Sequence, residues 1–259
     1  MKAVILAGGF GTRLSEETGI KPKPLVEIGS KPIIWHIMKT YAHHGITDFI
    51  ICAGYLGHTI KRYFADYFIN NADTTYDLKS NTLTIHNNHA EDWKVTVVDT
   101  GLETMTGGRL ARVRPFIGDE TFCMTYGDGV SDIDITKLID FHRSHGKLAT
   151  LTAVRAPGRF GIITMDDTES DKINSFNEKT EGESSMINGG YFVLEPKVLD
   201  YIKEGDQTTW EQQPLKSLAE DGQLHAFRHY GFWQPMDTLR DKVVLDAMWN
   251  EKKAPWKVW

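Results

Sequence analysis

Three glycines and an arginine follow the first apolar run and form the segment best suited to hold phosphate. Residues 2–7 (KAVILA) predict a buried strand, and residues 8–14 read GGFGTRL. Glycines after a parallel strand let backbone N–H groups approach an anion without an intervening side chain. Arg13 adds five fixed donors that suit forked contact with phosphate oxygens. We therefore predict a phosphate-binding loop, since a plain tight turn accounts for two glycines but not for three followed by Arg13.

The loop matches neither of the two common nucleotide motifs. A Walker A loop requires G-x-x-x-x-G-K-[ST], and the third glycine of the dinucleotide fingerprint G-x-G-x-x-G is replaced by Leu14. This departure weakens the hypotheses of a P-loop nucleotidase and of an NAD-dependent oxidoreductase.

Lys23 is the second residue that could act on a phosphate group. It stands between Pro22 and Pro24 in residues 21–25 (KPKPL), and the two rings stiffen the backbone on either side. A lysine aimed at an α-phosphate neutralises the charge that builds as the leaving group departs, without transferring a proton. The alternative is a proline-rich surface loop with solvated lysines.

Asp128 is the candidate metal ligand. It lies between Gly127 and Gly129 at the end of a predicted strand, where ligands of open α/β sheets gather. Mg²⁺ accepts carboxylate and phosphate oxygens while keeping water, so one or two aspartates suffice. Asp237 directly precedes a predicted helix, and from the sequence alone helix capping is the favoured role for it.

Histidines and cysteines give no support for zinc or for a covalent nucleophile. None of the ten histidines matches H-E-x-x-H, and His142 and His145 precede Gly146 near a helix end, which predicts solvated or capping roles. Cys52 and Cys123 each stand inside an apolar run without a base partner, and no G-x-S-x-G segment is present.

The elements that must position these residues alternate between strand and helix. Apolar spacing predicts strands at 2–7, 49–53, 121–126 and 148–154, and extended chain at 81–99. It predicts one helix with Pro32 in its first turn and Gly45 as its stop, and a second after Gly57 that carries Ile60, Tyr63, Phe64 and Tyr67. Further helices are predicted at 109–117, 135–144, about 209–220 and about 238–252. This order implies a mostly parallel sheet with helices on its faces. Residues 158–195 instead alternate glycine-containing turns with short strands, which indicates an α+β elaboration in the C-terminal half.

Composition limits the partners. The chain has 259 residues, 41% hydrophobic and 25% charged, and a net charge of −6. Nucleic acid and anionic membranes require clustered positive charge, so we expect neither as a partner. The N-terminal apolar run is too short for a signal peptide and no run of about 18 apolar residues occurs, so we expect a cytoplasmic protein.

Residues 6–14 (LAGGFGTRL) followed by KPKPL resemble the signature of the nucleoside-diphosphate-sugar pyrophosphorylases, which are sugar-1-phosphate nucleotidyltransferases. The resemblance spans nearly the whole chain, through the segments 127–129 (GDG), 178–179 (EK), 188–190 (NGG) and 233–238 (WQPMDT). Within the family it is greatest to glucose-1-phosphate cytidylyltransferases, on residues 105–110 (MTGGRL), 158–161 (GRFG) and 231–237 (GFWQPMD).

The resemblance implies one Rossmann-like domain over residues 1–259, with a nucleotide-binding half at about 1–130 and a sugar-binding half at about 131–259. It implies that CTP and α-D-glucose 1-phosphate give CDP-glucose and pyrophosphate by Mg²⁺-assisted in-line attack on the α-phosphate. A phosphate monoester is mostly dianionic at neutral pH, so no general base is needed, and the site must offset repulsion between two anions. Use of UTP, dTTP or GTP, or a non-catalytic subunit that senses nucleotide sugars, are the alternatives.

The resemblance also assigns residues and partners. The expected catalytic residues are Arg13, Lys23 and Asp128, and the expected metal ligands are Asp128 and Asp237. The expected nucleotide-binding residues are Leu6, Ala7, Gly8, Gly9, Phe10, Gly11, Thr12, Arg13, Lys23, Thr104, Gly108 and Arg109. For the base, the resemblance points to Thr104 and to the stretch from Thr106 to Arg109. The expected sugar-phosphate-binding residues are Gly127, Glu178, Lys179, Asn188 and Gly189. From the sequence alone, Arg109 could instead begin a solvated helix, residues 178–179 could form a surface ion pair, and residues 188–189 could form a turn. We also expect a homo-oligomer.

Overall fold

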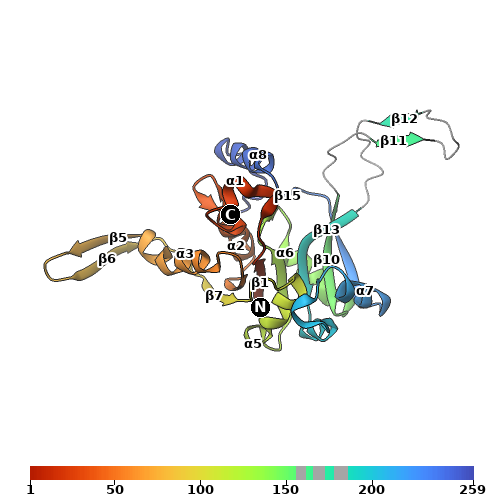
Figure 1. The fold of residues 1–259 in the computed structure, drawn as a ribbon, viewed down its shortest axis with the longest axis horizontal. Helices are drawn as coiled ribbons and strands as arrows, with labels where there is room; N and C mark the ends of the chain where they lie inside the picture. The colour runs from red at the N-terminus through yellow and green to blue at the C-terminus, as the bar shows by residue number, and fades with distance from the viewer. Residues whose placement is uncertain (156–161, 166–172, 178–185) are drawn as a thin grey trace.

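A seven-stranded sheet forms the centre of the molecule (Figure 1). The computed structural model describes residues 1–155, 162–165, 173–177 and 186–259. The strand order is β14-β10-β13-β8-β1-β4-β7. The strands span β1 (Lys2–Ala7), β4 (Asp48–Ala53), β7 (Lys94–Asp99), β8 (Phe122–Tyr126), β10 (Ala149–Arg155), β13 (Met186–Leu194) and β14 (Leu224–His229). Only β13 runs antiparallel to its neighbours within this sheet, so the prediction of a mostly parallel α/β fold is confirmed.

Strand β1 is buried on both faces, which explains its uninterrupted apolar sequence. Successive side chains point to opposite faces of a strand. Ala3, Ile5 and Ala7 belong to one core cluster, whereas Val4 and Leu6 belong to the other. The sheet therefore separates two hydrophobic layers.

Helices cover both faces of the sheet (Figure 1). Residues of α2 (Ile33–His43), α6 (Ile135–His145) and α8 (Leu239–Asn250) join the first cluster. Residues of α4 (Thr106–Arg112), α5 (Arg114–Ile117) and α7 (Gln213–Glu220) join the second. Helix α3 (Gly57–Asn70) follows β4, as the βα alternation predicts.

Some element bounds differ from those expected. The helix expected at 109–117 begins at Thr106 and is interrupted at Val113, because Pro115 fits only the first turn of a new helix, α5. The helix expected at 209–220 begins only at Gln213, again with a proline in its first turn. Extended chain at 81–99 is confirmed by β6 (Thr82–Asn88) and β7, but the partner of β6, strand β5 (Ala72–Asp77), was not predicted. The β5–β6 hairpin projects from the body of the molecule (Figure 1).

The remaining elements are short. They are the 3₁₀ turns η1 (Thr12–Leu14), η2 (Lys23–Leu25), η3 (Pro196–Tyr201) and η4 (Gly205–Gln207), helix α1 (Ser15–Thr18), and strand pairs β2 (Glu27–Ile28) with β3 (Lys31–Pro32), β9 (Gly129–Ser131) with β15 (Trp233–Pro235), and β11 (Ile162–Met165) with β12 (Ile173–Asn177).

The β9–β15 pair matters most for the site. It pairs Gly129 with Pro235, and the Met236 amide donates to the Asp128 carbonyl at 2.8 Å. Asp128 and Asp237 flank this pair, so two residues far apart in the sequence become neighbours.

Candidate active site

A cavity of about 670 Å³ opens at the carboxyl ends of β1 and β8, where ligands of α/β sheets bind. Of the predicted site residues, those that line it are Leu6, Ala7, Gly8, Gly9, Phe10, Gly11, Thr12, Arg13, Lys23, Thr104, Thr106, Arg109, Gly127, Asp128, Asn188 and Asp237. The structure thus brings most of the predicted nucleotide, sugar and metal residues to one place.

The glycine loop over residues 8–11 has a separate reason for each glycine. A Cβ on Gly8 would lie 2.1 Å from Nη1 of Arg109, and Gly11 has a φ of +66°. A Cβ on Gly9 would meet nothing within 4 Å. Gly8 and Gly11 are therefore required by the protein itself, whereas Gly9 leaves open space for a ligand.

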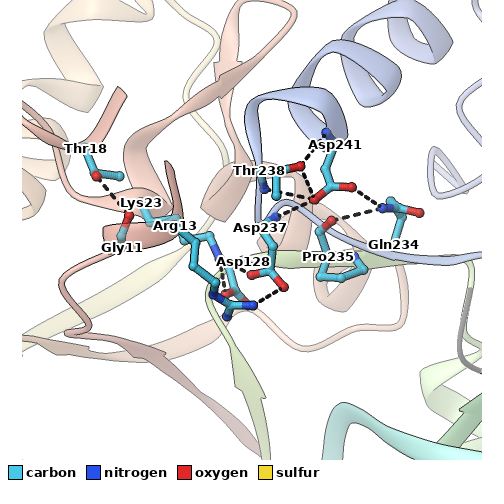
Figure 2. A network of polar contacts seen from close by, with 10 residues as sticks. All are labelled: Gly11, Arg13, Thr18, Lys23, Asp128, Gln234, Pro235, Asp237, Thr238 and Asp241. Carbon is cyan, nitrogen blue, oxygen red and sulfur yellow. Dashed lines mark hydrogen bonds and ion pairs between the residues drawn. The ribbon is translucent and has the colours of Figure 1, made fainter. Parts of the chain in front are cut away.

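Lys23 bridges two carboxylates (Figure 2). Its Nζ donates to Oδ2 of Asp128 and to Oδ1 of Asp237, each at 2.7 Å, and the residue is only 8% exposed. The alternative of a solvated lysine is therefore wrong. Backbone bonds from Leu25 to Pro22 and from Val26 to Lys23 fold the segment into η2, which holds the ammonium in place.

The Asp237 carboxylate also accepts a hydrogen bond from Arg13, whose Nη1 lies 2.7 Å from Oδ2 of Asp237 (Figure 2). Burial opposes ionisation of this carboxyl, but the bonds and charges of Lys23 and Arg13 outweigh burial and lower its pKa. Two cations and two carboxylates thus form one compact cluster on the cavity wall.

Helix capping is not the role of Asp237. The cap of α8 is Thr238, whose hydroxyl accepts from the amide of Asp241, while the Asp241 carboxylate accepts from the amide of Thr238 at 2.9 Å. The Asp237 carboxylate is consequently left to face Lys23 and Arg13, and the capping interpretation is corrected.

Arg109 is buried rather than solvated, at 5% exposure. Its Nη1 donates to Oγ1 of Thr100 at 2.8 Å and to the carbonyl of Gly101 at 2.7 Å, and its Nη2 donates to the carbonyl of Leu102 at 3.1 Å. The guanidinium is therefore anchored to residues 100–102 and lies against Gly8, and the hypothesis of a solvated helix start is wrong. Its contact with a base stays a prediction.

Gly108 lies beside the cavity rather than on its lining. A Cβ there would lie 2.6 Å from Cα of Asp206, so the glycine permits close packing of α4 on η4. Its proposed contact with nucleotide stays a prediction.

On the sugar side, the structure describes Gly127, Asn188 and Gly189. The amide of Gly127 donates to the Leu6 carbonyl at 2.9 Å, and the carbonyl of Gly189 accepts from Nε1 of Trp233 at 2.7 Å. Glu178 and Lys179, like residues 158–161, lie outside the described residues.

Several lining residues were not predicted. They are Pro24, Leu102, Glu103, Met105, Tyr126, Trp233 and Pro235. Tyr126 lies two residues before Asp128, and residues 233–235 lie just before Asp237. The nearness of these residues in sequence to the two predicted metal ligands was the signal that could have identified them.

His142 and the two cysteines are buried. His142 is 2% exposed and its ring contacts Thr150 and Glu195, so it is not solvated, although its carbonyl does accept the Gly146 amide at the end of α6. Burial raises the pKa of both cysteine thiols, Cys52 and Cys123, to about 12, as expected of unreactive thiols. Among the described residues, no three His, Cys, Asp or Glu side chains are grouped to hold a metal.

A profile of the nucleotidyl transferase family matches residues 2–238. The chain belongs to that family. It is 60% identical over 260 residues to the glucose-1-phosphate cytidylyltransferase of Salmonella typhi, and 45% identical over 259 residues to a probable glucose-1-phosphate cytidylyltransferase of Bacillus subtilis. Each alignment covers all of this chain and all of the relative. The predicted family is confirmed.

Solved structures confirm the fold of this nucleotidyl transferase. HddC from Yersinia pseudotuberculosis matches with a TM-score of 0.69 at 23% identity, over 96% of this chain and 99% of that one. Members of the family generally use a divalent metal ion, and the relatives' names imply nucleotide and sugar-phosphate substrates. Within the part of the chain that the structure describes, no helix has the length and apolar character needed to cross a membrane.

Proposed function

We propose that this nucleotidyl transferase joins CTP to α-D-glucose 1-phosphate, releasing pyrophosphate and forming CDP-glucose. The observation that carries the proposal is the cluster of Lys23, Asp128 and Asp237 on the wall of the cavity that the glycine loop enters. The choice of CTP and glucose 1-phosphate is supported by full-length relatives of that name, one of them 60% identical.

In the proposed reaction, a phosphate oxygen of the sugar phosphate attacks the α-phosphorus of the triphosphate. The new bond joins that oxygen to the α-phosphorus, and the bond to the bridging oxygen of pyrophosphate breaks on the opposite side. The nucleophile is already ionised at neutral pH, so no proton has to be removed. The residues must instead align two anions and offset their charges.

Backbone amides and two cationic side chains of the protein would offset the charges of the phosphates. The triphosphate would lie over the amides of residues 8–11, beside the open space at Gly9. Lys23 holds its ammonium on the same wall, and Arg13, whose side chain is 71% exposed, can reach a phosphate oxygen. In the free protein, the two aspartates balance these cations. A bound polyanion would draw the cations toward its oxygens.

The carboxylates fit a magnesium ion. Oδ2 of Asp128 and Oδ1 of Asp237 both lie 2.7 Å from one cationic atom, so they converge on a point where a small cation can be held. Asp128 and Asp237 would hold Mg²⁺ together with phosphate oxygens and water. When bound, the ion would supply further neutralisation of phosphate charge.

We assign the sugar phosphate to the side of the cavity lined by Gly127 and Asn188, with the neighbouring Gly189, and with Glu178 and Lys179, as further predicted contacts. The base is assigned to the side formed by Thr104 and Arg109. Both halves of the proposed single domain contribute strands to one sheet, because β8 pairs with β1 on one side and β13 on the other.

We further propose a cytoplasmic homo-oligomer. Two buried cysteines without a disulfide are compatible with a reducing compartment. Light scattering coupled to size-exclusion chromatography tests assembly, and a mass equal to one chain at assay concentration would refute it.

The proposed reaction is tested by incubating the protein with glucose 1-phosphate, Mg²⁺ and one triphosphate at a time, and measuring released pyrophosphate. We expect release with CTP to exceed release with UTP, dTTP or GTP. Faster release with another triphosphate would show that the protein prefers a nucleotide other than CTP. No release with any of them would support the non-catalytic alternative.

A further inference from the structure

Glu211 holds two residues that line the cavity, although it lies just outside the lining itself. Its Oε1 accepts from the hydroxyl of Tyr126 at 2.5 Å, and its Oε2 accepts from the hydroxyl of Thr106 at 2.6 Å. Tyr126 ends strand β8 on the sugar side, and Thr106 begins helix α4 on the base side. One carboxylate therefore joins the two walls of the cavity.

The carboxylate also fixes the direction of the hydroxyl hydrogens. A glutamate carboxylate at neutral pH can only accept hydrogen bonds, so Tyr126 must donate to Glu211. The lone pairs of the Tyr126 oxygen then face away from Glu211, where Nδ2 of Asn188 donates to that oxygen at 3.3 Å. Burial, followed by the Glu211 charge, raises the pKa of Tyr126 well above its usual range, so this hydroxyl keeps its proton.

A second hydrogen bond also orients the Asn188 amide with its NH₂ group toward Tyr126. Its Oδ1 accepts from the amide of Gly190 at 2.8 Å, which leaves the NH₂ group on the side of Tyr126. Gly190 itself has a φ of +78°, and a Cβ there would lie 2.5 Å from the Tyr126 ring. Because Asn188 lines the cavity, the second hydrogen of its NH₂ group is available to donate to a ligand oxygen.

The other oxygen of Glu211 secures the base side. Thr106 donates to Glu211 and accepts from the amide of Trp210 at 2.9 Å. The amides of Met105 and Gly107 donate to carbonyls of Asp206 and Thr208, each at 2.8 Å. The first turn of α4 thus rests on the segment that carries Glu211 and has support besides that carboxylate. Among the described residues, Glu211 is the one acceptor of the Tyr126 hydroxyl.

We propose that Glu211 is a positioning residue for the sugar phosphate: it sets the acceptor on Tyr126 and the donor on Asn188 that a hexose hydroxyl or phosphate oxygen meets. The proposal rests on the proposed function, because it assumes that the sugar phosphate occupies this side of the cavity. Glu211 itself would not touch the reacting atoms.

The substitution Glu211→Gln tests the direction of the bonds while keeping the size of the side chain. A Gln amide has one acceptor oxygen and an NH₂ group that only donates, so it cannot accept from both hydroxyls. If its NH₂ group faces Tyr126, the hydroxyl hydrogen turns elsewhere and the pattern offered to the sugar changes. We expect the KM for glucose 1-phosphate to rise roughly 10-fold, as for one lost hydrogen bond, with the KM for CTP and kcat changed less than about 3-fold.

The double variant with Tyr126→Phe separates positioning from general damage. If Glu211 acts through Tyr126, adding Glu211→Gln to Tyr126→Phe changes the KM for glucose 1-phosphate less than about 2-fold further. Glu220→Gln, an exposed site at the end of α7 with the same change in charge, is the matched control and should behave as the parent. Thermal unfolding of each variant verifies folding. Should Glu211→Gln unfold, Glu211→Asp replaces it, because the shorter side chain cannot span both hydroxyls.

Pyrophosphate release with varied glucose 1-phosphate and varied CTP provides all the constants. Parent-like KM values for Glu211→Gln, equal rises in both KM values, or multiplied effects in the double variant would each overturn the positioning role. If the parent protein itself releases no pyrophosphate, the proposed function fails instead, so the two failures are distinguishable.

Discussion

Protonation of His36 should destabilise the fold by an amount that can be worked out from its surroundings. The ring is fully buried, with Nε2 3.0 Å from the carbonyl of Ile28 and Nδ1 accepting from Nε1 of Trp256 at 3.4 Å. These contacts define the neutral tautomer with its hydrogen on Nε2, because Nδ1 must accept. The ring also lies edge-on to Trp249 of α8, with centroids 4.5 Å apart. His36 therefore helps hold the helix that begins directly after Asp237 and Thr238.

Burial lowers the pKa of His36 from 6.5 to about 4, although backbone hydrogen bonds partly oppose the shift. The folded state thus prefers the neutral ring, and stability is unaffected above the unfolded-state pKa of 6.5. As pH falls from 6.5 to about 4, the unfolded state takes up the proton first and stability is lost. Linkage gives a loss of about 2 kcal/mol at pH 5 and about 3 kcal/mol at pH 4 and below.

Urea unfolding followed by tryptophan fluorescence, at pH 7.5 and pH 5, measures this loss. The control is His36→Gln, which keeps a donor for Ile28 but cannot titrate. The variant should be less stable than the parent at pH 7.5, and the difference should shrink by about 2 kcal/mol at pH 5. Other titrating groups are common to both proteins and cancel. A difference that does not change with pH would refute the assignment of this pH dependence to His36.

Three further predictions concern the loop, the cap and the metal. Gly9→Ala should unfold at the same temperature as the parent, because its Cβ meets nothing in the free protein. Isothermal titration calorimetry should nevertheless show CTP binding at least about 10-fold weaker. Unchanged binding would mean that the triphosphate does not lie over Gly9. Thr238→Ala should lower the free energy of unfolding by about 1 kcal/mol in urea denaturation, because α8 loses its capping box; an unchanged value would mean that the cap is not stabilising. Removing divalent metal with EDTA should abolish pyrophosphate release, and excess Mg²⁺ should restore it. The unfolding temperature should change little, because Lys23 already bonds to both carboxylates in the free protein. Activity that survives EDTA would contradict a metal requirement.

The fold was predictable because its signals are local. The apolar run at residues 2–7 predicts β1 with the bounds that the structure has, and the spacing of apolar residues predicts α2 and α6 closely. Strand β5 of the hairpin was not predicted, because its sequence (ADTTYD) is mostly polar and its residues are largely exposed. A strand without a buried face has no alternation of apolar and polar residues from which it could be predicted.

The site was predictable only where residue type alone limits the chemistry. The glycines with Arg13, and Lys23 between prolines, indicated phosphate because few other roles need such residues together. Asp237 was harder, since its position before a helix also suits a cap. The spacing of Thr238 and Asp241 was the available signal, because that pair forms the capping box and releases Asp237.

Long-range pairing could not be read from local patterns. The β9–β15 pair that sets Asp128 beside Asp237 has only three residues in each strand. The anchoring of Arg109 depends on carbonyls of the 100–102 loop reaching it after the sheet has formed. Such contacts follow from the assembled fold, so the local sequence around Arg109 does not exclude a solvated side chain.

The central claim is that Lys23, together with a magnesium ion that Asp128 would help to hold, offsets the charge of two phosphate compounds during transfer. The most direct test is the kcat for pyrophosphate release with saturating CTP and glucose 1-phosphate in Lys23→Met and Asp128→Asn, beside Lys21→Met as the matched control on the same segment. We predict that both site variants remain folded and still bind CTP, with kcat lowered roughly 100-fold or more, while Lys21→Met stays within about 2-fold of the parent. Folded Lys23→Met and Asp128→Asn proteins that turn over at the parental rate would contradict the account.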